Sequence, residues 1–137
     1  KNVSDEIAQV VAKAINDPNA GVKAQSLWFF KDLVEKNQAF KEAVQAAVQG
    51  MMDDDYDVRK AALELFEVLI ERNQGYAEAL RVAEETIMSK DHIIRSNALV
   101  LFNYLIDKNQ GFENAIKAVM KGIIDPHWLV RQAALLY

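Results

Sequence analysis

The fold is decided by residues 69–76, Leu-Ile-Glu-Arg-Asn-Gln-Gly-Tyr, because a near copy of this stretch follows 36 residues later. Residues 105–112 read Leu-Ile-Asp-Lys-Asn-Gln-Gly-Phe, and residues 33–40 read Leu-Val-Glu-Lys-Asn-Gln-Ala-Phe. The same shift, without any gap, aligns Val22-Lys23, Val58-Arg59, Ile94-Arg95 and Val130-Arg131. Such a sustained period indicates a repeat protein built from one supersecondary unit.

Each unit contains two amphipathic segments with apolar residues at helical spacing. The first segment ends at a basic residue followed by Asn-Gln, with a glycine next in two copies, and these are the expected signals for a helix stop. The second segment leads to a turn with Asp17-Pro18, Asp53-Asp54, Ser89-Lys90 or Asp125-Pro126. These residues are typical of a helix start, and the capping residue is either the first of each pair or Asn19, Asp55 and Asp91, two positions later.

We therefore predict an all-α chain without linkers, in one domain covering residues 1–137. The predicted helices span 3–16, 20–36, 39–52, 56–72, 75–88, 92–108, 112–124 and 128–137. The predicted units are approximately 1–36, 37–72, 73–108 and 109–137, the last one truncated. Neither segment of a unit can bury its apolar face alone, so stacking of neighbouring units must supply the core.

Bulk composition agrees with a globular helical chain and argues against several functions. Apolar residues make up 51% of the chain and charged residues 26%, with only five glycines and two prolines. The net charge of −4 lacks the basic excess that nucleic-acid binding favours. No apolar run approaches the roughly 20 residues of a membrane span. The absence of cysteine excludes disulfides and thiolate metal sites, and the polar start of the chain, which does not look like a signal peptide, favours a cytoplasmic location.

The turn sequences resemble the HEAT-repeat signature, in a HEAT-like or armadillo-like α-solenoid. Residues 125–135 carry Asp-Pro, then Val-Arg, then alanine and leucine at helical spacing. Asp17-Pro18 with Val22-Lys23 is similar, Asp53 with Val58-Arg59 lacks the proline, and Ser89-Lys90 replaces Asp-Pro in the third copy. The resemblance covers the whole chain. It implies a right-handed α-α superhelix of four 36-residue helical hairpins, a concave side lined by the helices at 20–36, 56–72, 92–108 and 128–137, and a protein-binding scaffold.

Two further expectations concern the origin of the chain. Exposed positions differ between repeats 56–91 and 92–127 while core positions match, which favours natural repeats under separate selection over an engineered consensus sequence. The last predicted helix stops at Tyr137 after apolar Leu135 and Leu136, whereas terminal repeats normally carry a polar cap. We therefore expect a fragment of a longer solenoid.

The face opposite the core of the inner helices is the predicted partner-binding site. At 100° per residue this face holds positions 24, 28, 31, 32 and 35 of the first unit and the positions 36 and 72 residues later. The residues at these positions vary between copies. Its predicted binding residues are Trp28, Asp32, Glu35, Glu64, Glu67, Val68, Glu71, Val100, Tyr104 and Asp107; Lys31 and Asn103 share the face. An acidic surface with an aromatic at either end and Val68 between would suit a protein or peptide partner, basic in character. The alternative is an ordinary solvated face.

Other candidate sites have simpler explanations. Asp53, Asp55, Asp57 and Glu64 have the spacing of a calcium loop, but valine replaces the turn glycine, so helix capping explains them better. His92 and His127 occupy non-equivalent repeat positions and suggest neither a metal site nor a catalytic pair. The methionines, Met51, Met52, Met88 and Met120, are expected in the core. We predict no cofactor and no metal.

The sequence thus favours a non-enzymatic protein-interaction scaffold. One alternative is a structural or self-assembling segment, natural or engineered, whose units stack end to end. A second alternative is a HEAT-like enzyme or nucleic-acid-binding protein, although no phosphate loop, nucleophile motif or His-Glu pair occurs.

Overall fold

The computed structural model describes the backbone of residues 3–136, which contain eight α-helices and no strand. The chain divides into two compact units, residues 1–74 (unit 1) and 75–137 (unit 2). The helices of unit 1 are α1 (Val3–Ala14), α2 (Ala20–Glu35), α3 (Phe40–Met51) and α4 (Tyr56–Glu71). Those of unit 2 are α5 (Tyr76–Thr86), α6 (His92–Asp107), α7 (Phe112–Ile123) and α8 (Trp128–Ala134). The all-helical prediction is confirmed, and every helix begins at the predicted residue or one residue after it.

The helix starts repeat one capping arrangement. Asn19, Asp55 and Asp91 are the capping residues of α2, α4 and α6, and each side chain accepts a hydrogen bond from a backbone N–H in the first turn. The residue two positions earlier has a different role, because its side chain accepts from the N–H of the capping residue itself. This second bond is made by Asp17, Asp53, Ser89 and Asp125, over 2.8–3.1 Å. The sequence left these two positions as alternatives, and the structure uses both.

The turn inside each hairpin also repeats with the 36-residue period. Asn37, Asn73 and Asn109 adopt left-handed backbone with φ of 60°, 61° and 56°. The following glutamine N–H donates to the carbonyl of Leu33, Leu69 or Leu105 at 2.9 Å in each copy, which is the Schellman helix ending. The predicted role of the glycines is therefore corrected. Asparagine ends the first helix, and Gly75 and Gly111, like Ala39, take a second left-handed position just before the next helix.

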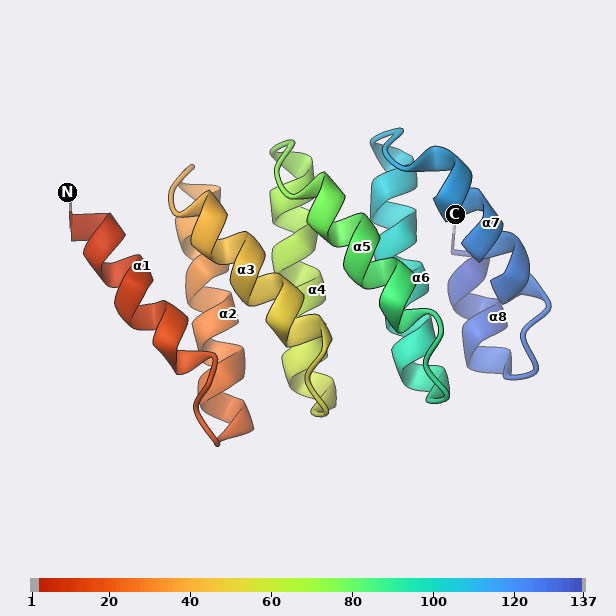
Figure 1. Ribbon diagram of the computed structural model, residues 1–137, viewed down its shortest axis with the longest axis horizontal. Coiled ribbons are helices and arrows are strands. Elements are labelled where there is room, and N and C mark those ends of the chain that lie inside the picture. Colours follow the sequence, from red (N-terminus) through yellow and green to blue (C-terminus); the bar gives the residue numbers. More distant parts are fainter. Residues whose placement is uncertain (1–2, 137) are drawn as a thin grey trace. The chain divides into compact units, whose positions relative to one another are not determined.

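Unit 1 has a core between two layers of helices. Within this unit α2 and α4 lie side by side, α3 packs on both of them, and α1 packs on α2 and α3 (Figure 1). Phe30 and Phe66, from α2 and α4, are fully buried. The close approach of α3 requires Gly50, because a Cβ there would lie 2.8 Å from the Cβ of Ala62.

Unit 2 repeats this arrangement with α6 and α8 in one layer, where α5 packs on α6 and α7 packs on both (Figure 1). Phe102 and Leu99 are buried, and Gly122 allows close approach of Ala134 and Leu99. Asn103 is only 1% exposed, and its side-chain Nδ2 donates to the carbonyl of Ala133 at 3.2 Å. The expectation that Asn103 lies on a solvated face is wrong, because α8 covers that side of α6.

A basic residue on α2 and another on α6 each bind the turn that precedes the next long helix of their unit. In unit 1, Lys23 on α2 donates to the Asp53 carboxylate at 2.8 Å. In unit 2, Arg95 on α6 makes two hydrogen bonds to Asp125, of 3.0 and 3.1 Å, and also donates to the carbonyls of Ser89 and Lys90. The hydrogen bond to Asp53 raises the pKa of Lys23, with partial burial opposing it. The hydrogen bond from Arg95 holds the pKa of Asp125 below its usual value, also against partial burial.

Candidate functional site

The predicted binding face is partly exposed in unit 1. Trp28 on α2 is 39% exposed, Asp32, Glu35, Glu67 and Glu71 are exposed, and Glu64 is half-buried. Val68 is only 7% exposed. The expectation that Val68 offers an exposed apolar anchor is therefore wrong, because α4 buries ten of its sixteen residues and is covered on several sides. The exposed part of this face is an acidic surface with Trp28 as its large aromatic.

A hollow of about 430 Å³ lies beside Trp28, between the N-terminal halves of α2 and α4. We call it the Trp28 hollow. Residues Ala20, Gly21, Ala24, Gln25 and Trp28 from α2 line one side, and Asp55, Asp57, Lys60 and Glu64 from the start of α4 line the other. Trp28 and Glu64 are the two predicted site residues that the structure brings together in this hollow.

The Trp28 hollow carries a net negative charge, because three carboxylates, Asp55, Asp57 and Glu64, face a single cation, Lys60. Asp55 is the capping residue of α4 and accepts from the N–H groups of Asp57 and Val58 at 2.9 and 3.1 Å. Glu64 lies 3.9 Å from the ammonium of Lys31 on α2, a loose and half-exposed ion pair. Such partly exposed pairs contribute little to stability.

The Trp28 hollow exists because small residues of α2, Ala20, Gly21 and Ala24, line it beside Trp28. Gly21 and Ala20 occupy the first turn of α2, where short side chains leave the ring of Trp28 accessible from the side of α4. A larger residue at position 24 would fill the same space, and Ala24 is itself buried. The arrangement can accept a slender side chain that ends in a cation.

Seven residues of the hollow were not among the predicted site residues, and four of them are polar: Gln25, Asp55, Asp57 and Lys60. The sequence did contain a signal for Lys60, because position 60 is in register with position 24 of the predicted face. Asp55 and Asp57 were interpreted as capping acids, and Asp55 does cap α4. No sequence signal indicated that the cap of one helix lies beside the exposed face of its neighbour.

The remaining predicted site residues belong to unit 2. Val100 and Tyr104 on α6 are half-buried, and Asp107, the last residue of α6, is exposed. All three lie on α6 at the register positions of Trp28, Asp32 and Glu35.

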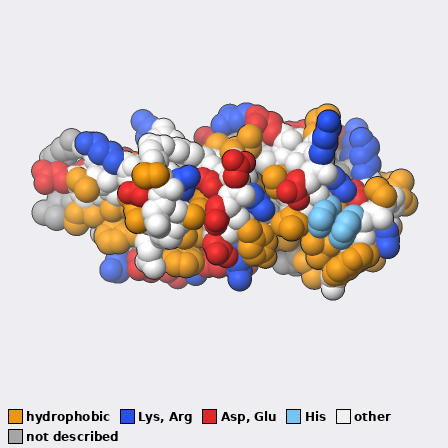
Figure 2. Space-filling model, turned by 90° about the horizontal axis from the view of Figure 1, so that it is seen from below, with side chains coloured by type: hydrophobic (Ala, Val, Ile, Leu, Met, Phe, Trp, Pro, Cys, Tyr) orange, Lys and Arg blue, Asp and Glu red, His pale blue; other side chains and the backbone are white. Residues whose placement is uncertain are grey.

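The two histidines, which occupy different positions in their repeats, lie against each other in unit 2. The ring centroids of His92 and His127 are 3.7 Å apart with an interplanar angle of 10°, and the two side chains are in contact at the surface (Figure 2). Trp128 stacks on His127 at 5.8 Å. The Nδ1 of His127 accepts from the N–H of Leu129 and caps α8, so this nitrogen carries no proton. Partial burial lowers the pKa of His127, and the charges of His92 and Arg95 add to the effect.

The methionines differ from the core role expected for them. Met51 is fully buried, but Met52, Met88 and Met120 are 53%, 83% and 64% exposed. Met88 and Met120 line a second hollow, of about 530 Å³, in unit 2 between α5 and α7. Among the residues described, no three His, Asp or Glu side chains are grouped closely enough to hold a metal ion.

Comparison with models of known protein families gives no match, and comparison with curated proteins finds no similar sequence. No helix in residues 3–136 is both long and apolar enough to cross a membrane.

Proposed function

We propose that the chain is a protein-interaction module of the HEAT-like solenoid type, with four repeats of about 36 residues, that binds a basic peptide segment on the acidic face of its inner helices. Three features support a repeat architecture: the helix caps, the left-handed asparagines and the turn hydrogen bonds recur in both units with the same period. Repeat proteins of this kind present extended surfaces for partners.

The Trp28 hollow is the observation that carries the binding proposal. An indole face attracts cations, and the attraction grows when the cation is partly removed from water. Asp57 and Glu64 stand across the hollow from Trp28 and supply opposite charge. A lysine or arginine side chain of a partner can therefore lie against the ring with its cation among the carboxylates.

The acidic residues beyond the hollow extend this surface along unit 1. Asp32 and Glu35 on α2 and Glu67 and Glu71 on α4 are all exposed. They favour a segment with several basic residues and increase the rate of encounter by long-range attraction. Val100, Tyr104 and Asp107 occupy the corresponding register positions on α6 of unit 2.

Binding of labelled peptides tests the proposal directly. Peptides with alternating basic and apolar residues are titrated with the chain and followed by fluorescence anisotropy, against acidic peptides of the same apolar content. We expect the basic peptides to bind. Added salt should lower their affinity, because the pairing is electrostatic. Trp28→Ala should reduce affinity about tenfold or more, as expected for a central aromatic contact.

Matched controls separate this face from the rest of the surface. Phe29 is a neighbouring aromatic of similar exposure, 43%, but it lines a different hollow with Val10 and Val11 of α1. Phe29→Ala should therefore leave peptide affinity unchanged, and so should Glu85→Gln on α5, whereas Glu64→Gln with Asp57→Asn should weaken binding. Equal binding of acidic and basic peptides, or full binding by the folded Trp28→Ala variant, would show that this face is not the site.

Self-association is a second candidate function, favoured by exposed apolar side chains in both units. Ile7, Val10 and Phe29 are exposed in unit 1, and Leu135 and Leu136 in unit 2. Concentration-dependent sedimentation that is abolished by Phe29→Ser would favour self-association, and a constant monomer mass would exclude it.

A further inference from the structure

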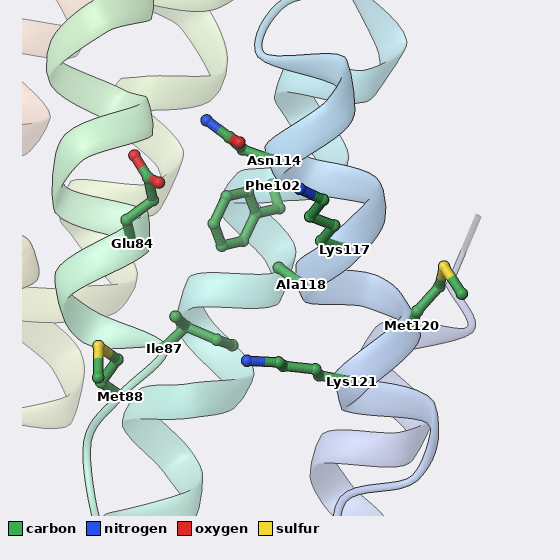
Figure 3. A pocket seen from close by; sticks show the side chains of 9 residues that line it. All are labelled: Glu84, Ile87, Met88, Phe102, Asn114, Lys117, Ala118, Met120 and Lys121. Carbon is green, nitrogen blue, oxygen red and sulfur yellow. The ribbon is translucent and has the colours of Figure 1, made fainter.

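The hollow between α5 and α7, which we call the α5–α7 groove, lies on different helices from the acidic face and has the opposite chemistry. Ala118 on α7 and the buried Phe102 on α6 form its apolar base. Ile87 and Met88, just after the last residue of α5, form one side, and α7 forms the other, with the Met120 side chain at the edge that points away from α5 (Figure 3). The groove offers an apolar surface that is open to solvent.

Two lysines give this groove a local positive charge in a chain whose net charge is −4. Lys117 and Lys121 stand one helical turn apart on α7, and both side chains are exposed. Figure 3 shows the Lys121 side chain extending from α7 toward α5. Glu84 on α5 is the single acidic residue of the lining, so the groove has an excess of one positive charge.

The 36-residue period provides an internal comparison for this groove. Two repeats earlier, in unit 1, the matching positions lie between α1 and α3, which pack directly on each other. There, Asn16 and Gln49 stand where Met88 and Lys121 stand in unit 2, and the Gln49 amide donates to the Asn16 side chain across the gap. Gln45 occupies the position of Lys117, and Glu42 that of Asn114.

The matched positions of the two units therefore differ in side-chain chemistry. Between the matched positions of unit 1 and unit 2, the Asn16–Gln49 bridge is replaced by Met88 and Lys121, Glu42 by Asn114 and Gln45 by Lys117, while Glu84 stands where unit 1 has Ala12. Met88 is 83% exposed, and a flexible thioether adapts to varied apolar partners. Exposed apolar side chains that are grouped in a groove and bordered by charged residues offer a surface that a partner can cover.

We propose that the α5–α7 groove docks an amphipathic helical segment of a partner protein whose apolar side chains enter the groove and whose flanking acidic residues pair with Lys117 and Lys121. Helix-in-groove recognition uses apolar anchors spaced by three or four residues. The lysines select acidic over basic segments and set the orientation of the helix, because Glu84 repels acidic side chains on the α5 side.

A peptide-display selection tests the proposal on the full chain. The library encodes helical peptides without a bias in charge, binders to the parent chain are kept, and their affinity for the Lys117→Glu plus Lys121→Glu variant is measured afterwards. We expect the selected peptides to be acidic, with apolar residues at helical spacing. The double charge reversal should lower their affinity at least about tenfold, since two ion pairs become like-charge contacts. Met88→Ser should also lower the affinity of these peptides.

Register-matched controls keep the result specific. Met52 is the equivalent of Met88 one repeat earlier and is also exposed, so Met52→Ser should have no effect. Lys41→Glu on α3 tests a general charge effect and should leave affinity unchanged. Circular dichroism checks that each variant is folded, and Trp28→Ala should retain these peptides.

Three results would overturn the proposal. A selection that yields no peptide dependent on the two lysines, or one that yields basic peptides, would remove the assigned partner. Equal weakening by Met52→Ser and Met88→Ser would place the contact elsewhere. Binding to phosphatidylserine vesicles that depends on Lys117 and Lys121, without any selected peptide, would assign the groove to a membrane surface instead.

Discussion

Asp125 connects three parts of unit 2 through a single carboxylate. It accepts two hydrogen bonds from Arg95 on α6 and one from the backbone N–H of His127. Because Arg95 holds the pKa of Asp125 low, the stabilising contribution is complete above the ordinary carboxyl pKa of about 3.9 and is lost as the pH falls through the folded-state value.

We predict that Asp125→Asn lowers the free energy of unfolding by about 1 kcal/mol at neutral pH, at the lower end for charged hydrogen bonds because the pair is partly exposed. Parent and variant should become equally stable below the folded-state pKa. Denaturant unfolding followed by Trp128 fluorescence in a Trp28→Phe background measures this. Glu85→Gln removes an exposed carboxylate as the control, and a cost that persists in acid would point to lost packing instead of lost charge.

His127 should make the stability of unit 2 depend on pH in a higher range. The unfolded chain takes up the proton near pH 6.5 and the folded chain only at lower pH, since the pKa of His127 is lowered. Its contribution is therefore complete above about pH 6.5 and is lost as the pH falls through the folded-state pKa. Protonation also ends the capping bond from Leu129 and adds a cation near His92, Arg95 and Arg131, which Asp125 only partly offsets.

The variant His127→Asn keeps a capping side chain but has no proton to gain. We predict that the unfolding midpoint of the parent falls more steeply than that of the variant between about pH 7 and pH 5, before most carboxylates titrate. Midpoints measured across this range by Trp128 fluorescence give the answer. Parallel curves for parent and variant would assign the pH dependence to other groups.

At the scale of the helices, the left-handed turn positions test whether the repeats are equivalent. Ala39 has φ of 57°, where the other two hairpins carry Gly75 and Gly111. Left-handed backbone costs an alanine roughly 1 kcal/mol, partly offset by the greater freedom of glycine in the unfolded chain.

We therefore predict that Ala39→Gly stabilises the chain by about 0.5 kcal/mol and that Gly75→Ala destabilises it by about 1 kcal/mol. Chemical denaturation followed by circular dichroism measures both. Ala77→Gly, within the first turn of α5, should have the opposite sign to Ala39→Gly because glycine weakens a helix. A loss of stability in Ala39→Gly would mean that the alanine side chain makes a contact worth more than the strain.

Gly50 shows close packing overriding helix propensity. Alanine favours a helix interior over glycine by up to about 1 kcal/mol. At position 50, however, the added Cβ would lie 2.8 Å from the Cβ of Ala62, which cannot rotate away. We predict that Gly50→Ala destabilises the chain by about 1–2 kcal/mol net, as overpacking usually does. The exposed Gln45→Ala on the same helix should be nearly neutral, and a Gly50→Ala variant as stable as the parent would show that α3 shifts freely.

The sequence predicted the helices well because their signals are local. Caps, left-handed asparagines and apolar spacing depend on neighbouring residues, so every helix start was predicted within one residue. Burial was predicted less well. Asn103 was expected on a solvated face, but helices with neighbours on several sides bury residues well outside one core stripe. The exposed Met52, Met88 and Met120 were missed because the period assigns a position without showing whether a neighbour covers it.

At the scale of the whole molecule, the candidate site was predicted only in part. Trp28 and Glu64 were identified from helical spacing on one face, and they do line a common hollow. Its other wall comes from the capping turn of α4, a contact between segments about 30 residues apart that no periodicity within a single helix reports. The stacking of His92 on His127 was missed for the same reason, since the two residues occupy different positions in their repeats.

The two units should differ in stability, because they bury apolar residues unequally. Among the residues described, 21 apolar side chains are buried in unit 1 and 13 in unit 2. Unit 2 also exposes Phe112, Met120 and Ile124. Since apolar burial is the main stabilising term, we predict that unit 2 unfolds at a lower denaturant concentration than unit 1. Trp28 and Trp128 report on the units separately in the Trp128→Phe and Trp28→Phe variants. Coincident transitions would show one cooperative structure, and the reverse order would show that buried apolar content does not set the stability of these repeats.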